Sequence, residues 1–329
     1  MRKRRGALSA PARALLALAL VFAAGLVFDA DGAFYRWDTH GAMLRQASVH
    51  GILACGMTLV IVTAGIDLAV GSVLALAAVV FSLLTIHAGW GAPAAIAAVL
   101  GAGVGLGAAS GGLISTFGLQ PFIVTLALMV FGRGLAKQVS GGQKISQAVL
   151  KADGSGYDYV DLPRVFELVD SRLLGGRVWL VTLVFVAIAA ASWVILARLR
   201  VGRHAYAVGA NPEAARLSGV PVRRTLVLVY AWSGLCAAVA GICQAAQEQQ
   251  GDPETGTGYE LSAIAMVVIG GTSLMGGRGG VVLTLVGVFT IGYLQKILSL
   301  NAVGEAGRLM LTGAIIVGAV LFQRSRRNG

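Results

Sequence analysis

Side chains able to carry out chemistry are few in this chain of 329 residues, which has 4 histidines, 3 cysteines and 15 acidic residues. His40, His50, His87 and His204 are spread over different segments, and none has a nucleophile or metal-ligand partner at a suitable spacing. We therefore predict no catalytic residue and no metal site.

Thiol chemistry and ATP binding are not expected either. Cys55, Cys236 and Cys243 lie in apolar stretches without metal-ligand spacing, a pattern typical of buried thiols. Residues 276–280 read Gly-Gly-Arg-Gly-Gly and lack the Lys and the hydroxyl residue of a phosphate-binding loop. We expect no ATPase activity and no cofactor in this chain.

One carboxylate, that of Asp67, stands between two apolar stretches and is flanked by Gly65 and Gly71. Acids within a membrane are costly and by default indicate a functional site. Two interpretations stay open. Asp67 either caps the helix that follows, where the helix dipole favours an anion, or acts directly as a ligand.

The elements that hold these residues are long apolar segments. Hydrophobic residues make up 57% of the chain and charged residues 12%, whereas a soluble domain carries about 25% charged residues. A membrane-spanning helix needs about 20 mostly apolar residues. The sequence predicts such spans near residues 10–28, 46–65, 71–86, 92–115, 121–138, 178–197, 225–246, 261–275, 279–298 and 308–322.

We therefore predict an all-α polytopic membrane protein, with residues 1–329 forming one transmembrane domain of about ten helices. Eight or eleven helices remain alternatives, because residues 261–298 could hold half-helices. The first span resembles a signal peptide but has no convincing cleavage site, so we expect it to be retained.

The distribution of charge predicts the orientation. The net charge of +11 would also suit nucleic acid, but the basic residues gather at both ends and in residues 198–224, where six Arg face one acid, Glu213. Cytoplasmic loops are rich in Lys and Arg. We predict cytoplasmic tails at 1–9 and 323–329, a cytoplasmic loop at 198–224, external loops at 139–176 and 247–260, and no nucleic-acid partner.

Glycine is concentrated in two places. Residues 101–112 contain six glycines, which we interpret as close helix packing rather than a dinucleotide fingerprint. Residues 270–280 are dense enough in glycine to break a helix, either lining a cavity or forming a tight cytoplasmic turn.

A second break precedes Pro121. Polar or flexible backbone interrupts the apolar helices at 65–72 and 118–125, and we predict that any solute that crosses this protein passes near these breaks, where Gln120 and Thr125 can hydrogen-bond hydroxyl groups. The alternative is that both side chains only satisfy freed backbone groups.

The loop at 198–224 contains a well-marked short helix. Asn211 suits the N-cap, Pro212 the first helical position, Glu213 the first turn and Gly219 the stop. These residues predict a helix over 212–218. A helix this short is unstable alone in water, so we expect it to dock on a partner.

This loop resembles the cytoplasmic coupling loop of ABC importer permeases, through Glu213-Ala214-Ala215 followed by Gly219. A closer resemblance, to the ribose-type monosaccharide permeases (ribose, xylose, arabinose, galactoside), rests on several segments in the family's order. They are residues 51–54 (Gly-Ile-Leu-Ala), 58–61 (Thr-Leu-Val-Ile), 65–68 (Gly-Ile-Asp-Leu), 118–126 (Gly-Leu-Gln-Pro-Phe-Ile-Val-Thr-Leu), and 259–261 (Tyr-Glu-Leu) leading into 269–280. Ala69 departs from the family's frequent Ile-Asp-Leu-Ser, so no sugar is assigned.

The resemblance implies a bacterial inner-membrane complex. Cytoplasmic ATPase subunits would bind ATP and Mg and dock at Asn211, Pro212, Glu213, Ala214, Ala215 and Gly219. An external binding protein would deliver a small sugar, and a second permease copy or a paralogue would complete the pathway. The alternatives are an ABC permease for branched-chain amino acids or nucleosides, and an ion-coupled secondary transporter with Asp67 as nearly its sole intramembrane acid.

Overall fold

The protein is a bundle of apolar helices. The computed structural model describes residues 9–151, 156–173, 175–304, 306–308, 310–311 and 313–314. Within these residues, eight helices are long and apolar enough to cross a membrane. They are α1 (Ala10–Val27), α2 (Trp37–Val62), α3 (Val70–Ser82) with its π-helical continuation η2 (Leu83–His87), α4 (Ala92–Phe117), α5 (Pro121–Ser140), α7 (Leu180–Ala197), α10 (Val222–Glu248) and α12 (Val281–Leu300). The all-α polytopic class is confirmed.

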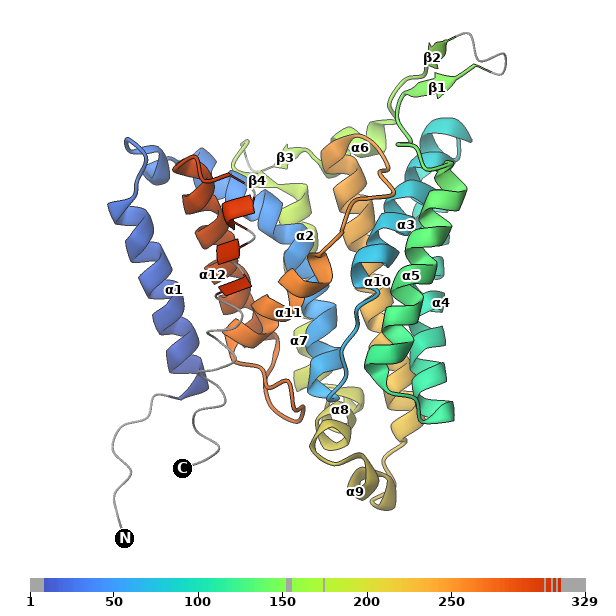
Figure 1. Ribbon diagram of the computed structural model, residues 1–329, viewed down its shortest axis with the longest axis vertical. Helices are drawn as coiled ribbons and strands as arrows, with labels where there is room; N and C mark the ends of the chain where they lie inside the picture. The colour runs from blue at the N-terminus through green and yellow to red at the C-terminus, as the bar shows by residue number, and fades with distance from the viewer. Residues whose placement is uncertain are drawn as a thin grey trace.

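The connecting segments lie on two opposite faces of the bundle (Figure 1). One, named here the α9 face, carries the short helices α8 (Arg200–Ala210) and α9 (Pro212–Leu217). The other, the α6 face, carries η1 (Ala33–Tyr35), α6 (Arg164–Val169) and two antiparallel hairpins. The hairpins pair β1 (Ala148–Leu150) with β2 (Tyr157–Tyr159) and β3 (Arg172–Leu173) with β4 (Val178–Trp179). The segments predicted as loops at 139–176 and 198–224 thus lie on opposite faces.

The span predicted at 261–275 is wrong. This region holds α11 (Tyr259–Gly270), whose 12 residues extend about 18 Å, whereas the hydrocarbon core is about 30 Å thick. The helix stops because Gly271 adopts φ +107, and a glycine turn follows. One half-helix, α11, lies in this region, as the alternative prediction allowed, whereas the span predicted at 279–298 is present as the full-length α12. The span predicted at 308–322 lies largely outside the described residues, as do the tails 1–8 and 323–329.

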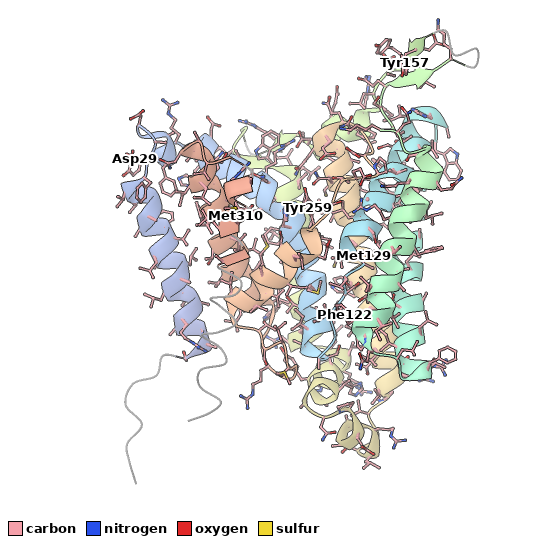
Figure 2. The ribbon with its side chains drawn as sticks, viewed as in Figure 1. Asp29, Phe122, Met129, Tyr157, Tyr259 and Met310 are labelled. Carbon is pink, nitrogen blue, oxygen red and sulfur yellow. The ribbon has the colours of Figure 1, made fainter. Side chains whose placement is uncertain are left out.

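Two helices are followed by irregular chain that turns back into the bundle. Residues 63–69 connect α2 to α3, and residues 249–258 connect α10 to α11. In Figure 1, α2 runs toward the α9 face and α10 toward the α6 face, so the two interrupted units run in opposite directions. Figure 2 places Tyr259, the first residue of α11, inside the height of the bundle rather than at its end.

The starts of α3 and α11 meet. A Cβ on Gly71, in the first turn of α3, would overlap the carbonyl oxygen of Gly256 and the carboxylate of Glu260. Only glycine permits this approach, because any larger residue would force the two backbones apart. Broken helices that converge inside a bundle are a common way for transport proteins to build a site.

The glycine-rich stretch of α4 packs closely against another helix, as predicted, but only through the face that contacts α10. A Cβ on Gly103 would lie 2.6 Å from both the Ala238 Cβ and the Gly234 carbonyl oxygen of α10. The same face of α4 brings Gly107 and Gly111 against the α10 backbone, whereas Gly101, Gly105 and Gly112 have no such neighbour within 4 Å. Close approach of α4 to α10 therefore depends on three of the six glycines.

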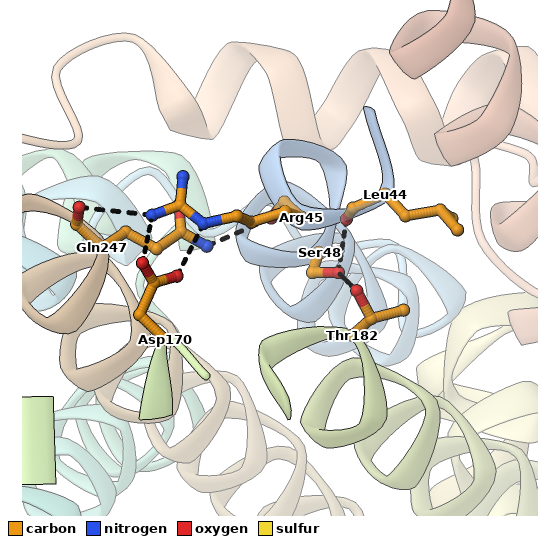
Figure 3. A network of polar contacts seen from close by, with 6 residues as sticks. All are labelled: Leu44, Arg45, Ser48, Asp170, Thr182 and Gln247. Carbon is orange, nitrogen blue, oxygen red and sulfur yellow. Dashed lines mark hydrogen bonds and ion pairs between the residues drawn. The ribbon is translucent and has the colours of Figure 1, made fainter. Parts of the chain in front are cut away.

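The bundle is tied together near the α6 face by a polar network (Figure 3). Arg45 of α2 donates two hydrogen bonds to Asp170, at 2.6 and 2.7 Å, and a third to the carbonyl oxygen of Gln247 in α10. One turn away, Ser48 donates to the Leu44 carbonyl at 2.6 Å and to Thr182 of α7 at 3.3 Å. Below this layer the interior is mostly apolar and includes the three cysteines, which are buried as predicted.

Candidate functional site

Asp67 lies in the break between α2 and α3 and is only 5% exposed. Its Oδ1 accepts a hydrogen bond from the Ala69 amide at 3.0 Å, and its Oδ2 accepts one from the Ser233 hydroxyl of α10 at 2.7 Å. The N-cap position of α3 belongs to Ala69, which has no side-chain cap. Asp67 therefore does not cap α3 in the strict sense. It closes the turn that leads into α3 and fastens that turn to α10.

Thr125 of α5 fastens the same break from the other side. Its hydroxyl lies 3.1 Å from the carbonyl oxygen of Ile66 and 2.9 Å from that of Pro121. Asp67 and Thr125 thus act on neighbouring residues of one segment. Gln120, the N-cap residue of α5, is exposed and makes no side-chain cap bond. The structure brings two of the three predicted pathway residues together and leaves the third at the end of α5.

A hydroxyl that sequence analysis did not single out lies beside this break. Tyr230 of α10 is fully buried, and its hydroxyl, against Gly65, has no hydrogen-bond partner among the described residues. Buried polar groups are normally paired, so this one is available to a water molecule or to a substrate hydroxyl. Tyr230 and Ser233 are three residues apart on α10 and so face the same segment.

The break between α10 and α11 is held by charge. Arg133 of α5 donates to the carbonyl oxygens of Pro253 and Thr255, the latter at 2.7 Å. One turn along α5, Lys137 pairs with Glu254 at 2.6 Å. Arg133 was missed, although a charge inside the predicted span 121–138 was visible as an anomaly. These contacts close α5 over the segment that leads to α11.

The predicted helix at 212–218 is present as α9, Pro212–Leu217. The Asn211 side chain accepts hydrogen bonds from the amides of Glu213 and Ala214, at 3.0 and 2.9 Å. Gly219 ends it with φ +80 and no neighbour that would obstruct a Cβ. The N-cap, the proline at the first helical position and the glycine stop are all confirmed.

The outer surface of α9 is exposed. Ala215 is buried toward the protein, whereas Glu213 and Ala214 face away. Leu217 is 78% exposed, outside the apolar spans. Sequence analysis missed Leu217, and also α8, the amphipathic helix that carries α9.

Comparison with known proteins identifies the family. Residues 41–320 match the family described as branched-chain amino acid transport system / permease component. The chain belongs to this family of permeases. The chain is similar to the ribose import permease protein RbsC of Escherichia coli K12, which is 37% identical over 96% of this chain and 94% of its own length.

Other relatives agree. The ribose import permease protein RbsC of Bacillus subtilis 168 is 38% identical over 86% of this chain and 84% of its own length. The xylose transport system permease protein XylH of E. coli K12 is 31% identical over 87% of each chain. No solved structure matches the chain. The resemblance seen in short segments therefore extends over nearly the whole sequence, and these relatives are permease components rather than enzymes.

Proposed function

We propose that this permease forms the transmembrane pathway of an ATP-driven importer for a small sugar. The observation that carries the proposal is the 37% identity to a ribose import permease across 96% of the chain. The capped helix α9, with Leu217 exposed, supports it because a permease that lacks an ATP site needs a surface on which an ATPase can act.

The proposed complex assigns a partner to each face. Two ATPase subunits, which hold ATP and Mg, dock at the α9 face in the cytoplasm, and a sugar-binding protein docks at the α6 face outside. A second permease copy or a paralogue completes the pathway. Substrate passes near the breaks bordered by Asp67, Gln120 and Thr125. Each ligand shifts the complex toward the state that it binds better.

The orientation can be tested directly. The three native cysteines are buried, so single cysteines at Tyr157 and Ser218, both exposed, are labelled without background. An impermeant reagent applied to intact, wall-stripped cells should label Tyr157→Cys alone. Labelling of Ser218→Cys from outside would refute the assignment of the α9 face to the cytoplasm.

The substrate class is tested by reconstitution. Proteoliposomes that contain the permease and its ATPase, supplied with the binding protein outside and ATP inside, should accumulate labelled ribose or xylose. Uptake should stop without ATP and should persist when ionophores collapse ion gradients, which separates this function from ion-coupled transport. The family description makes branched-chain amino acids the second candidate. ATP-dependent uptake of leucine without sugar uptake would replace the proposal with that one.

A further inference from the structure

Three backbone segments meet where α8 packs on the bundle. The Gly277 amide, in the loop 271–280, donates to the carbonyl oxygen of Val62, the last residue of α2, at 2.9 Å. Gly209 of α8 lies against both partners. A Cβ at Gly209 would overlap the same Val62 oxygen and would lie 2.8 Å from the Gly277 nitrogen. The end of α2, the loop and α8 are therefore in direct backbone contact.

The loop is attached to α8 at a second point. The Tyr206 hydroxyl donates to the carbonyl oxygen of Gly279 at 2.8 Å. A tyrosine hydroxyl is protonated at neutral pH and can donate, and burial raises the pKa of Tyr206 further above its ordinary value. Tyr206 and Gly209 are three residues apart and so share one face of α8. That face is turned toward the loop.

The loop itself is braced internally. The Ser273 amide donates to the Arg278 carbonyl at 3.0 Å, and the Gly280 amide donates to the Thr272 hydroxyl at 3.2 Å. A Cβ at Gly276 would lie 2.7 Å from the Ala64 Cβ. A short loop closed by its own hydrogen bonds and packed this tightly moves as one piece with the helices that it joins.

Both interrupted units are attached to α8 through these contacts. Val62 leads directly into residues 63–69 and then α3, while the loop 271–280 follows α11 directly. The first turn of α3, which follows residues 63–69, meets the first turn of α11, where Gly71 lies against Glu260. A displacement of α8 therefore acts on both α3 and α11, which are already in contact with each other.

We propose that the α8 junction, defined as Val62, Tyr206, Gly209, Gly276 and Gly277, transmits movement of the coupling loop to α3 and α11 together. This rests on the proposed function, in which an ATPase moves α9, and it names the route by which that movement reaches the pathway. Tyr206 and Gly209 are positioning residues that act through the backbones they hold. Close-packed contacts of this kind switch between discrete arrangements rather than deforming continuously.

The first test removes one hydroxyl. Tyr206→Phe loses the bond to Gly279, and Tyr35→Phe is the matched control because Tyr35 donates to the Leu26 carbonyl at 3.1 Å near the α6 face. Four quantities are measured in proteoliposomes: recovery of the ATPase with the permease, basal ATP hydrolysis, hydrolysis stimulated by binding protein and sugar, and sugar transported per ATP. Tyr206→Phe should leave ATPase recovery and basal ATP hydrolysis unchanged. It should lower stimulated hydrolysis and the sugar transported per ATP about threefold to tenfold. Tyr35→Phe should change none.

The second test adds one methyl group. Gly209→Ala places a Cβ against Val62 and should reduce stimulation more strongly than Tyr206→Phe, whereas Gly105→Ala, with no neighbour within 4 Å, should match the wild type. If Gly209→Ala does not assemble, Tyr206→Phe decides.

Full stimulation and full transport per ATP in Tyr206→Phe would overturn the proposed route. A decrease in stimulated hydrolysis that matches a loss of ATPase recovered with the permease would also overturn it, because the hydrogen bond would then only stabilise the fold. Failure of the wild-type chain to bind or stimulate an ATPase would instead refute the proposed function.

Discussion

Leu217 should contribute measurably to binding of the ATPase. Burying a leucine side chain completely is worth about 1.5–3 kcal/mol. Leu217 is 78% exposed in the isolated chain, so most of that free energy is available to a partner that covers it. Leu217→Ala retains the Cβ and favours the helix, so it should lose about 1–2 kcal/mol of binding free energy without weakening α9. The dissociation constant should rise about 5-fold to 30-fold.

The assay is titration of the permease, held in lipid nanodiscs, with purified ATPase subunit. The control is Leu168→Ala, since Leu168 is 60% exposed on α6, which like α9 has 6 residues but lies on the opposite face. Leu168→Ala should leave the affinity unchanged. A change of less than twofold for Leu217→Ala, or equal losses in the two variants, would show that the partner does not cover the tip of α9.

Three further changes test other contacts. Gly103→Ala should lower the melting temperature in detergent, because its Cβ would lie 2.6 Å from α10 atoms and overpacking costs about 1–3 kcal/mol. Its control, Gly105→Ala, should leave the melting temperature unchanged or raise it. Equal changes in the two variants would contradict the packing of α4 on α10 through one face only. Thr125→Val should lower the free energy of unfolding by about 1 kcal/mol and leave the half-saturating sugar concentration for transport unchanged, because the Thr125 hydroxyl contacts backbone carbonyls. Gln120→Leu should raise the half-saturating sugar concentration. A raised half-saturating concentration in Thr125→Val but not in Gln120→Leu would exchange the roles of the two residues. Asn211→Ala removes a cap bonded to two amides and should destabilise α9 by about 1 kcal/mol, visible as faster amide exchange at Glu213 and Ala214.

Local features of the chain could be predicted because their physics is local. The apolar segments are long enough to show their spans, and the cap, proline and glycine around α9 each act within a few residues. The break at Asp67 was visible in the sequence because a carboxylate inside a continuous membrane-spanning helix is energetically costly, so an acid between two apolar stretches indicates an interruption. These features need no knowledge of which helices are neighbours.

Features that depend on neighbours were not predictable from the sequence. Residues 261–275 are apolar enough for a span, but their helix ends at Gly270, where Gly271 adopts φ +107 and leads into a loop that packs against Ala64 and α8. Similarly, half of the glycines in residues 101–112 contact α10 and the rest do not, a division that depends on how α4 is rotated in the bundle. Hydropathy gives the composition of a segment but not what lies against it.

The contacts of the interrupted helices suggest how movement could reach them. A helix that crosses the whole bundle moves as a rigid rod along its axis. In contrast, α3 and α11 each begin inside the bundle, so their first turns can shift without moving the rest of the bundle as a block. At these ends Gly71 and Glu260 are in contact, and Arg133 and Thr125 hold the adjoining breaks to α5. The residue before the α2–α3 break, Val62, and the loop after α11 contact α8. A solute pathway bordered by these breaks would therefore respond to events at the α9 face while the apolar bundle around it remained sealed.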